Sequence, residues 1–265
     1  MTIEVLLDKG KIRRSFAAAA QSYDGLAALQ RQVGLELLRR FPPRNGTGPI
    51  LDVGCGTGFL TGHLAAAGSE EHLLALDIAM PMLAACRGKY PRMRADYICA
   101  DAEKLPFAAH SIDRIYSNLA LQWAVDLPAA LLELKRVLKR PGSLVFATFG
   151  PRTLLELKQA WATVDDYAHV NEFHAAGRIE MFLRDAGFNE IDLASLLYRS
   201  EYPDVESLMR ELKGMGAHNV NRGRKPGPTT RTQLQQMIKH YPRQDSRPGI
   251  TAGYEIIFVR AVARA

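Results

Sequence analysis

Three acidic residues and a short run of glycines stand at positions from which one bound molecule could be contacted. Asp52 directly precedes the glycines, and Asp77 and Asp101 each follow one of the next two apolar stretches. The glycines occupy every second position and are Gly54, Gly56 and Gly58. Glycine lets the backbone turn sharply and lets a ligand approach the main chain closely. Because ligands of open α/β sheets bind outside the carboxyl ends of the strands, we expect these residues to line one site.

The charges at this site favour a cationic nucleoside over a phosphate. A carboxylate at Asp52 would repel a pyrophosphate but attract the ammonium or sulfonium group of S-adenosylmethionine. A dinucleotide fingerprint needs glycine where the chain has Phe59, and no Gly-Lys-Ser/Thr sequence follows the loop. Asp77 could accept hydrogen bonds from both ribose hydroxyls, and Asp101 could accept one from an adenine amino group. Two plainer interpretations remain open: the glycines form only a tight turn, or Asp101 caps a short helix.

The elements that would position these residues alternate between strand and helix. An amphipathic helix is predicted over residues 22–41, where leucine and valine recur at three- and four-residue steps. Strands are predicted at 50–53, 72–77, 96–100, 112–117 and 144–149, and helices from the glycine loop to about 67 and at 80–89. A further helix should begin at an Asp126 N-cap and end at Pro141-Gly142. Beyond residue 150 we expect helices near 153–163 and 176–186, a strand near 189–198, a helical basic insertion over about 203–240 and a last strand over 254–262. This alternation indicates an α/β fold with a parallel sheet and helices on both faces.

The composition is that of a globular chain with a full hydrophobic core. Of the 265 residues, 47% are hydrophobic and 23% charged, which excludes a mainly disordered, collagen-like or disulfide-scaffold chain. No run of about 18–20 apolar residues is present, so neither a membrane-spanning helix nor a membrane partner is expected. The N-terminal sequence has no apolar signal-peptide core, and the three scattered cysteines indicate a reducing, cytoplasmic compartment. The net charge of +6 favours acidic partners.

The run from Asp52 to Gly58, together with Asp77 and Asp101, resembles the class I S-adenosylmethionine-dependent methyltransferases. The resemblance implies one domain over residues 1–265, with a Rossmann-like, mostly parallel seven-stranded sheet and a late antiparallel strand. It also implies that the segment 203–240 is a small helical insertion or lid within that domain. The implied cofactor is S-adenosyl-L-methionine, with Met82 or Met80 lining the adenine pocket. The implied cofactor-binding residues are Asp52, Gly54, Cys55, Gly56, Gly58, Asp77, Met82, Asp101, Ala102 and Asn118.

Three further segments carry a closer resemblance, to the malonyl-acyl-carrier-protein O-methyltransferases of biotin synthesis. They are 118–123 (NLALQW), the stretch from Phe149 to Phe173 that contains HVNEF, and 212–217 (LKGMGA) with the positions 223–224 and 230–234. This resemblance implies methyl transfer to the free carboxylate of a malonyl thioester on an acidic acyl carrier protein, giving the methyl ester that starts pimeloyl and biotin synthesis. Since a carboxylate with a reference pKa of about 4 is already ionised at neutral pH, the reaction needs no general base. Catalysis would then rest on proximity, alignment and exclusion of water.

The side chains expected to hold the acceptor are polar or aromatic. For Tyr23, Trp123 and His169 a packing or capping role remains an open alternative, although loop positions carry function more often than core positions. These candidates are Tyr23, Gln122, Trp123, His169 and Asn171. The cysteines and histidines show no zinc-type spacing, so no metal is expected.

The basic segment over residues 210–231 is the predicted docking surface for the carrier protein. It holds six Lys or Arg residues against one acid, Glu211. The residues predicted to contact substrate or carrier are His218, Arg222, Arg224 and Lys225. A solvated surface is the plainer alternative, and nucleic-acid binding is disfavoured because few aromatic residues lie among the charges.

Two other functions stay open on the sequence alone. One is a related methyltransferase that acts on another small acceptor, such as a quinone precursor or a dicarboxylic acid. The other is an assembly factor for a respiratory complex, because a mitochondrial relative of this family has a similar sequence near 118–123. The N-terminus of this chain lacks an Arg-rich, acid-poor transit peptide, which argues against the organelle version.

Overall fold

A computed structural model of the chain shows its fold. The structure describes residues 7–43, 48–67, 72–217, 227, 229–243 and 248–264. The four residues predicted to contact substrate or carrier, His218, Arg222, Arg224 and Lys225, lie outside the described residues.

Seven strands form one sheet in the order β3-β2-β1-β4-β5-β7-β6. The strands are β1 (Ile50–Val53), β2 (Leu73–Asp77), β3 (Ala95–Cys99), β4 (Ile112–Asn118), β5 (Leu138–Phe149), β6 (Asn189–Tyr202) and β7 (Ile250–Ala263). Strands β1 to β5 pair in parallel, whereas β7 is antiparallel to both β5 and β6. The predicted mostly parallel seven-stranded sheet with a late antiparallel strand is therefore confirmed.

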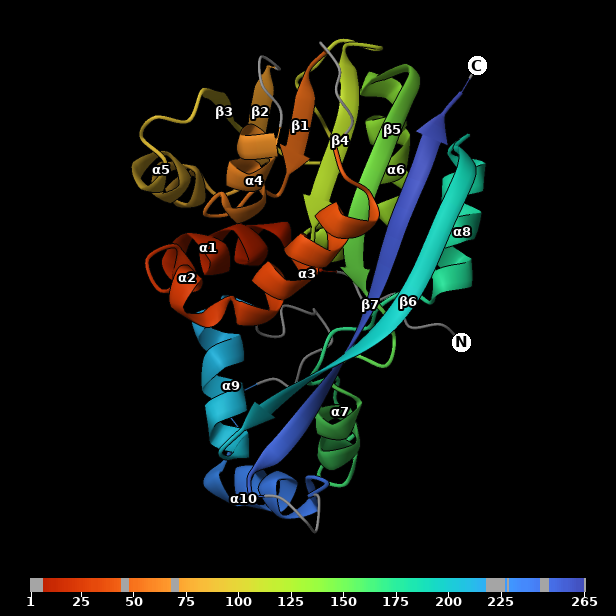
Figure 1. Ribbon diagram of the computed structural model, residues 1–265. Coiled ribbons are helices and arrows are strands. Elements are labelled where there is room, and N and C mark those ends of the chain that lie inside the picture. Colours follow the sequence, from red (N-terminus) through yellow and green to blue (C-terminus); the bar gives the residue numbers. More distant parts are fainter. Residues whose placement is uncertain are drawn as a thin grey trace.

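Helices cover both faces of this sheet. Neighbouring residues of each strand point to opposite faces, and because apolar side chains lie on both, each face needs a layer of helices to bury them. The helices before β1 are α1 (Lys9–Ala19), α2 (Tyr23–Leu26) and α3 (Ala28–Arg40), and those between later strands are α4 (Phe59–Ala67), α5 (Met80–Lys89), α6 (Leu127–Val137), α7 (Leu155–Ala162), α8 (Ala176–Asp185), α9 (Val205–Gly214) and α10 (Arg231–His240). On β1, Ile50 belongs to the core that includes residues of α3 and α4, and Leu51 belongs to the core that includes residues of α6 and α8. Figure 1 shows α3 and α4 on one face and α6 and α8 on the other.

The N-terminal helices lie across the edge at which the parallel strands end. In Figure 1 the arrowheads of β1, β4 and β5 point toward the layer formed by α1, α2 and α3. Below this layer, the ends of β6 and β7 extend into a narrower part of the molecule that also holds α7, α9 and α10. The N-terminal layer therefore lies beside the sheet edge and next to this lower part.

The structure differs from several of the predicted elements. Strand β6 extends to Tyr202 and β7 begins at Ile250, beyond the predicted ranges 189–198 and 254–262. The helix predicted over 22–41 is broken at Ala27 into α2 and α3, and α1 was not predicted. The Asp126 N-cap is present, since its side chain accepts the N–H of Ala129 at 2.9 Å, but the helix ends at Val137 and not at Pro141-Gly142. Leu138 is fully buried and pairs with Ile112, so burial and sheet pairing draw 138–142 into β5. Within the described residues, no helix has both the length and the apolar character needed to cross a lipid bilayer.

Candidate functional site

The glycine loop after β1 has a backbone that only glycine adopts easily. The φ angles of Gly54, Gly56 and Gly58 are +71°, +54° and +86°, in the left-handed region that side chains disfavour. A Cβ on Gly54 would lie 2.2 Å from the Cβ of Ala120, so this glycine lets the loop pack against the turn after β4. A Cβ on Gly56 would meet only Tyr23, at 4.0 Å. The main chain at Gly56 is therefore open to a ligand.

A narrow cavity, which we name the edge cavity, lies between this loop, the ends of β2, β3 and β4, and the N-terminal helices. Seven of the ten residues predicted to bind cofactor line it: Gly54, Gly56, Asp77, Met82, Asp101, Ala102 and Asn118. Asp52, Cys55 and Gly58 do not line it. Met82 is buried, whereas the alternative, Met80, is exposed. The structure thus brings both of the later acids, but not Asp52, to one cavity.

Asp77 is held in place by the backbone around it. Its Oδ2 accepts the N–H of Gly56 at 2.9 Å and its Oδ1 accepts the N–H of Ala79 at 2.8 Å. Burial raises the pKa of Asp77 above its usual value, and these backbone hydrogen bonds oppose that rise. Each carboxylate oxygen can accept more than one hydrogen bond, so Asp77 can still accept from two ligand hydroxyls.

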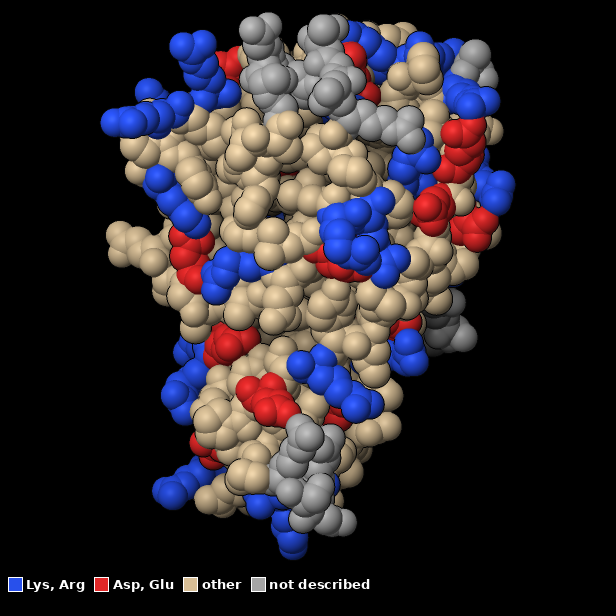
Figure 2. Space-filling model, viewed as in Figure 1, with Lys and Arg blue, Asp and Glu red and all other residues tan. Residues whose placement is uncertain are grey.

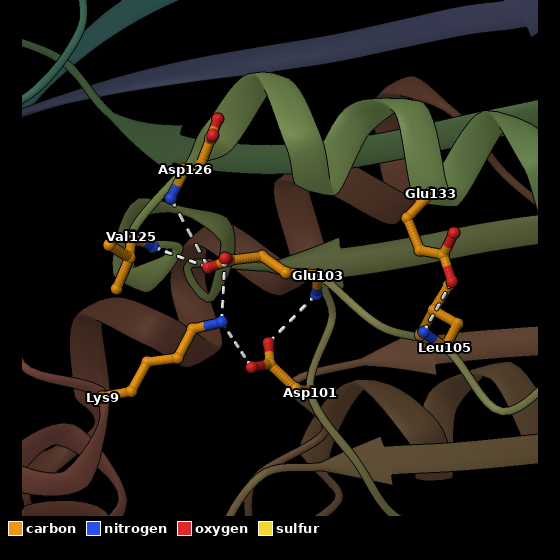
Figure 3. Close-up of polar contacts among 7 residues, drawn as sticks. All are labelled: Lys9, Asp101, Glu103, Leu105, Val125, Asp126 and Glu133. Carbon is orange, nitrogen blue, oxygen red and sulfur yellow. Dashed lines mark hydrogen bonds and ion pairs between the residues drawn. The ribbon is translucent and has the colours of Figure 1, made fainter.

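Asp101 belongs to a charged cluster that ties α1 to the sheet edge (Figure 3). The Lys9 ammonium donates to Asp101 and lies 2.8 Å from Glu103 Oε2. Glu103 Oε1 in turn accepts the N–H of Val125 at 2.7 Å. Asp101 Oδ1 accepts the N–H of Glu103 at 3.0 Å, but residues 102–103 form a turn, so the alternative that Asp101 caps a short helix is wrong. Lys9 was missed by the sequence analysis, because a single lysine in an unassigned segment gives no spacing signal.

Asp52 has a different environment from the one that its sequence position suggested. It is only 1% exposed, and its Oδ2 accepts the hydroxyl of Thr61, on α4, at 2.6 Å. Burial raises the pKa of Asp52 to about 7. The expectation that Asp52 lies directly beside a bound cation is therefore not supported, because its side chain points behind the glycine loop into the core.

We expect Asp52→Asn to remove a pH dependence of stability. The folded protein binds the Asp52 proton more tightly than the unfolded chain, so the free energy of unfolding falls as pH rises toward about 7 and stays lower above it. The amide removes the buried charge and keeps an oxygen for Thr61, so the variant should be more stable than the parent at pH 8. Urea unfolding at pH 5 and pH 8 measures this, with Asp166→Asn as the exposed control. A variant that loses stability at pH 8 would contradict the burial argument.

Trp123 stands where the edge cavity meets a second, larger cavity. It lies in a short 3-10 turn, Leu121–Trp123, and its ring makes an edge-to-face contact with Phe16 of α1 (centroid distance 5.3 Å, interplanar angle 82°). Among the described residues, it is the one that lines both cavities. Gln122, by contrast, lines neither: its amide donates to Leu119 O at 2.6 Å and accepts from Thr148 at 3.3 Å. Those hydrogen bonds let Gln122 support the turn, and a contact between Gln122 and the acceptor stays a prediction.

The second cavity, which we name the helical cavity, has a volume of about 640 Å³ and lies between α3, α7, α9, α10 and the loop 168–173. His169 and Asn171 both line it. The His169 ring stacks on Trp161 at 3.8 Å, and its Nε2 lies 2.7 Å from Asp165 Oδ1. Asn171 is 7% exposed, and its Oδ1 has no hydrogen-bond partner among the described residues.

Tyr23 joins the predicted cofactor residues at the edge cavity. Its burial, with Asp77 and Asp24 nearby, raises the pKa of the phenol far above its usual value. Tyr23 therefore keeps its proton at neutral pH and can donate a hydrogen bond but cannot act as a base.

The neighbouring Asp24 was also missed, and it ties the N-terminal layer to the glycine loop. Its carboxylate accepts the Thr57 hydroxyl at 2.5 Å and the Lys89 ammonium at 2.8 Å. On the other side of the layer, Ser22 donates to Gly214 O, at the end of α9, at 3.1 Å. The layer is thus fixed to both the edge cavity and the helices around the larger cavity. Among the described residues, no cluster of three or more His, Cys, Asp or Glu side chains could hold a metal ion.

The chain is similar in sequence and in fold to known methyltransferases. Residues 51–146 match a family model described as a methyltransferase domain. The malonyl-[acyl-carrier protein] O-methyltransferase of Methylococcus capsulatus is 42% identical over 92% of this chain and 90% of its own length. The biotin biosynthesis bifunctional protein BioHC of Cellvibrio japonicus is also 42% identical, over 97% of this chain, but the chain spans only 51% of that longer protein. A solved putative methyltransferase from Bacillus halodurans, 16% identical, superposes with a TM-score of 0.64 over 88% of this chain and all of its own, and shows the same fold.

Proposed function

The chain belongs to the malonyl-[acyl-carrier protein] O-methyltransferase family, and from this membership we propose that it methylates the free carboxylate of a malonyl group on an acyl carrier protein. The methyl donor is S-adenosylmethionine. Methylation removes the charge of the malonyl end, so chain-elongation enzymes made for apolar acyl groups can accept it on the way to biotin. The observation that carries this proposal is the meeting, at Trp123, of an acid-lined edge cavity with a larger, mostly apolar cavity.

The residues of the edge cavity fit S-adenosylmethionine. Asp77 would accept the ribose hydroxyls, and the main chain at Gly56 would lie beside the methionine portion. Asn118 Oδ1 is buried without a hydrogen-bond partner among the described residues, so it is available to an ammonium group. Asp101 accepts from Lys9 and from the N–H of Glu103, and because each carboxylate oxygen can accept more than one hydrogen bond, it can still accept from an adenine amino group. When bound, the cofactor supplies an electrophilic methyl group that the acceptor oxygen takes up as the carbon–sulfur bond breaks.

The chain's own contribution to the reaction is positioning. Trp123, the one described residue shared by the two cavities, has no basic group, and Tyr23 holds its proton at neutral pH. An ionised carboxylate needs no base, so neither of these side chains has to take up a proton from the acceptor. Alignment of reacting groups and exclusion of water can together supply roughly 7–11 kcal/mol of the barrier.

Lys9→Met should weaken binding of S-adenosylhomocysteine about fivefold, because half-exposed ion pairs of this kind contribute on the order of 1 kcal/mol. The lysine holds α1 over the edge cavity through Asp101 and Glu103. Isothermal titration calorimetry at low and high salt measures the loss, which should shrink as salt rises. Lys11→Met is the matched control, since Lys11 lies on the same helix and its nearest ion-pair partner is Asp8, at 3.7 Å. Tighter binding by Lys9→Met would show instead that the ammonium competes with the ligand for Asp101.

The proposed activity is tested by incubating the purified protein with labelled S-adenosylmethionine and malonyl carrier protein. A base-labile methyl group on the carrier is the expected product. Transfer only to another small acceptor would select the related-methyltransferase alternative. Cofactor binding without any transfer would favour the assembly-factor alternative.

Docking of an acidic carrier protein can be tested through its salt dependence. On the face drawn in Figure 2, Lys and Arg side chains lie among Asp and Glu side chains over the lower part of the molecule, and the described cations at the helical cavity are Arg210 and Lys213. We propose that the insertion 203–240, with the predicted residues His218, Arg222, Arg224 and Lys225, provides the docking surface. Added salt should then raise the KM for malonyl carrier protein far more than the KM for a small malonyl thioester. Equal salt sensitivity would contradict docking by charge.

A further inference from the structure

We infer that the helical cavity binds the pantetheine arm of the carrier protein in an extended form, from the surface at α9 to Trp123. The inference rests on the proposed function and goes beyond it, because it assigns a binding site to the part of the thioester that does not react. A malonyl group has few heavy atoms. If each takes up the roughly 30 Å³ of a water molecule in the liquid, the group needs about 200 Å³. The cavity, at about 640 Å³, is much larger than that.

The direction of the arm follows from the way the two cavities meet. The reacting carboxylate must reach the edge cavity, where the methyl donor binds, and Trp123 is the described residue that the cavities share. The thioester end of the malonyl group must then point away from the edge cavity, into the helical cavity. Whatever is attached to that sulfur has to lie along the helical cavity walls.

The walls match the chemistry of pantetheine, an uncharged chain with a dimethyl group and two amides. Much of the surface is apolar and includes Leu157, Phe173, Met209 and Leu234. A polyanion would be a poor occupant, because the charged side chains at this cavity are two cations and two anions. They are Arg210 and Lys213, and Glu206 and Glu211.

Two side-chain oxygens at the helical cavity lack hydrogen-bond partners in the described part of the chain and could accept the two amide N–H groups of pantetheine. Gln30 Oε1 and Asn171 Oδ1 both belong to residues that line the helical cavity, and neither has a hydrogen-bond partner among the described residues. Within the part of the chain that the structure describes, the Gln30 amide nitrogen donates to a sulfur atom, Met215 Sδ, at 3.4 Å. Buried polar atoms are nearly always hydrogen-bonded in native proteins, so two orphan acceptors on one cavity indicate a ligand that carries donors.

The test compares a malonyl thioester of pantetheine with one of N-acetylcysteamine, which lacks the dimethyl portion and one amide. We expect kcat/KM to be at least about tenfold higher for the pantetheine thioester. Met209→Trp, which narrows the cavity, should remove this preference by lowering kcat/KM for the pantetheine thioester more than for the short one, and thermal unfolding reports separately that the variant is folded. Met181→Trp is the matched control, because Met181 is exposed on α8 and does not line the cavity.

Equal kcat/KM values for the two thioesters, or an unaltered preference in Met209→Trp, would overturn the inference while leaving the methyltransferase activity intact. If neither these thioesters nor malonyl carrier protein is methylated, the proposed function fails. The cavity is then judged by calorimetry with pantetheine alone, in the presence of S-adenosylhomocysteine. Binding by the parent protein that Met209→Trp weakens at least about tenfold supports the arm site, and no binding rejects it.

Discussion

Asp77→Ala is expected to weaken binding of S-adenosylmethionine at least about a hundredfold, because hydrogen bonds to a charged acceptor contribute roughly 1.5–3 kcal/mol each and two are lost. Asp77 lies at the end of β2 with both oxygens oriented by backbone N–H groups, so its geometry is set before the ligand arrives. Calorimetry with S-adenosylmethionine and with S-adenosylhomocysteine measures the effect. Both ligands carry the ribose, so both should lose affinity to a similar degree.

Asp77→Asn is the control that tests whether the alanine variant loses affinity only because the glycine loop has loosened. Because the carboxylate also accepts the N–H groups of Gly56 and Ala79, alanine could loosen the glycine loop. Asp77→Asn keeps one acceptor oxygen and should fall between the parent and alanine. Thermal unfolding of all three proteins separates a loss of folding from a loss of binding. An alanine variant that is folded and binds within about threefold of the parent would exclude Asp77 as the ribose acceptor.

Trp123→Ala is expected to lower kcat about a hundredfold, since displacing a reacting group by about 1 Å can cost that much. The indole lies at the junction of the two cavities and is held by Phe16. Its removal would join the cavities more widely, admit water and release the acceptor carboxylate from its aligned position. Cofactor affinity should change much less, because the polar contacts at Asp77 and Asp101 remain. Steady-state kinetics with the short malonyl thioester, together with calorimetry for the cofactor, measures both quantities.

Trp123→Phe provides the matched comparison, because it keeps an aromatic ring at the junction and can still meet Phe16. It should recover most of the lost kcat. If the alanine variant keeps full kcat, Trp123 is only a packing residue and the alignment argument fails. A loss that appears equally in kcat and in cofactor affinity would place the indole in the cofactor site alone.

The outline of the fold was predictable because strand and helix periods, glycines and caps are local features. The strands around the glycine loop and the helix α5 fell where the apolar runs and polar breaks placed them. The end of α6 was not predictable in the same way. Leu138 to Gly142 contains the Pro-Gly pair that usually stops a helix, yet pairing with β4 and burial of Leu138 make this segment part of β5.

The meeting of Asp77, Asp101 and the alternating glycines at one sheet edge follows from the amino-acid sequence, because the carboxyl ends of parallel strands share that edge. Three other features depend on how the chain packs: Asp52 turns inward to Thr61, Lys9 reaches Asp101 from a helix 92 positions earlier, and Trp123 lines both cavities. Contacts of this kind depend on the direction of single side chains and on segments far apart in the chain. No local period encodes them, so they appear only once the helices are packed on the sheet.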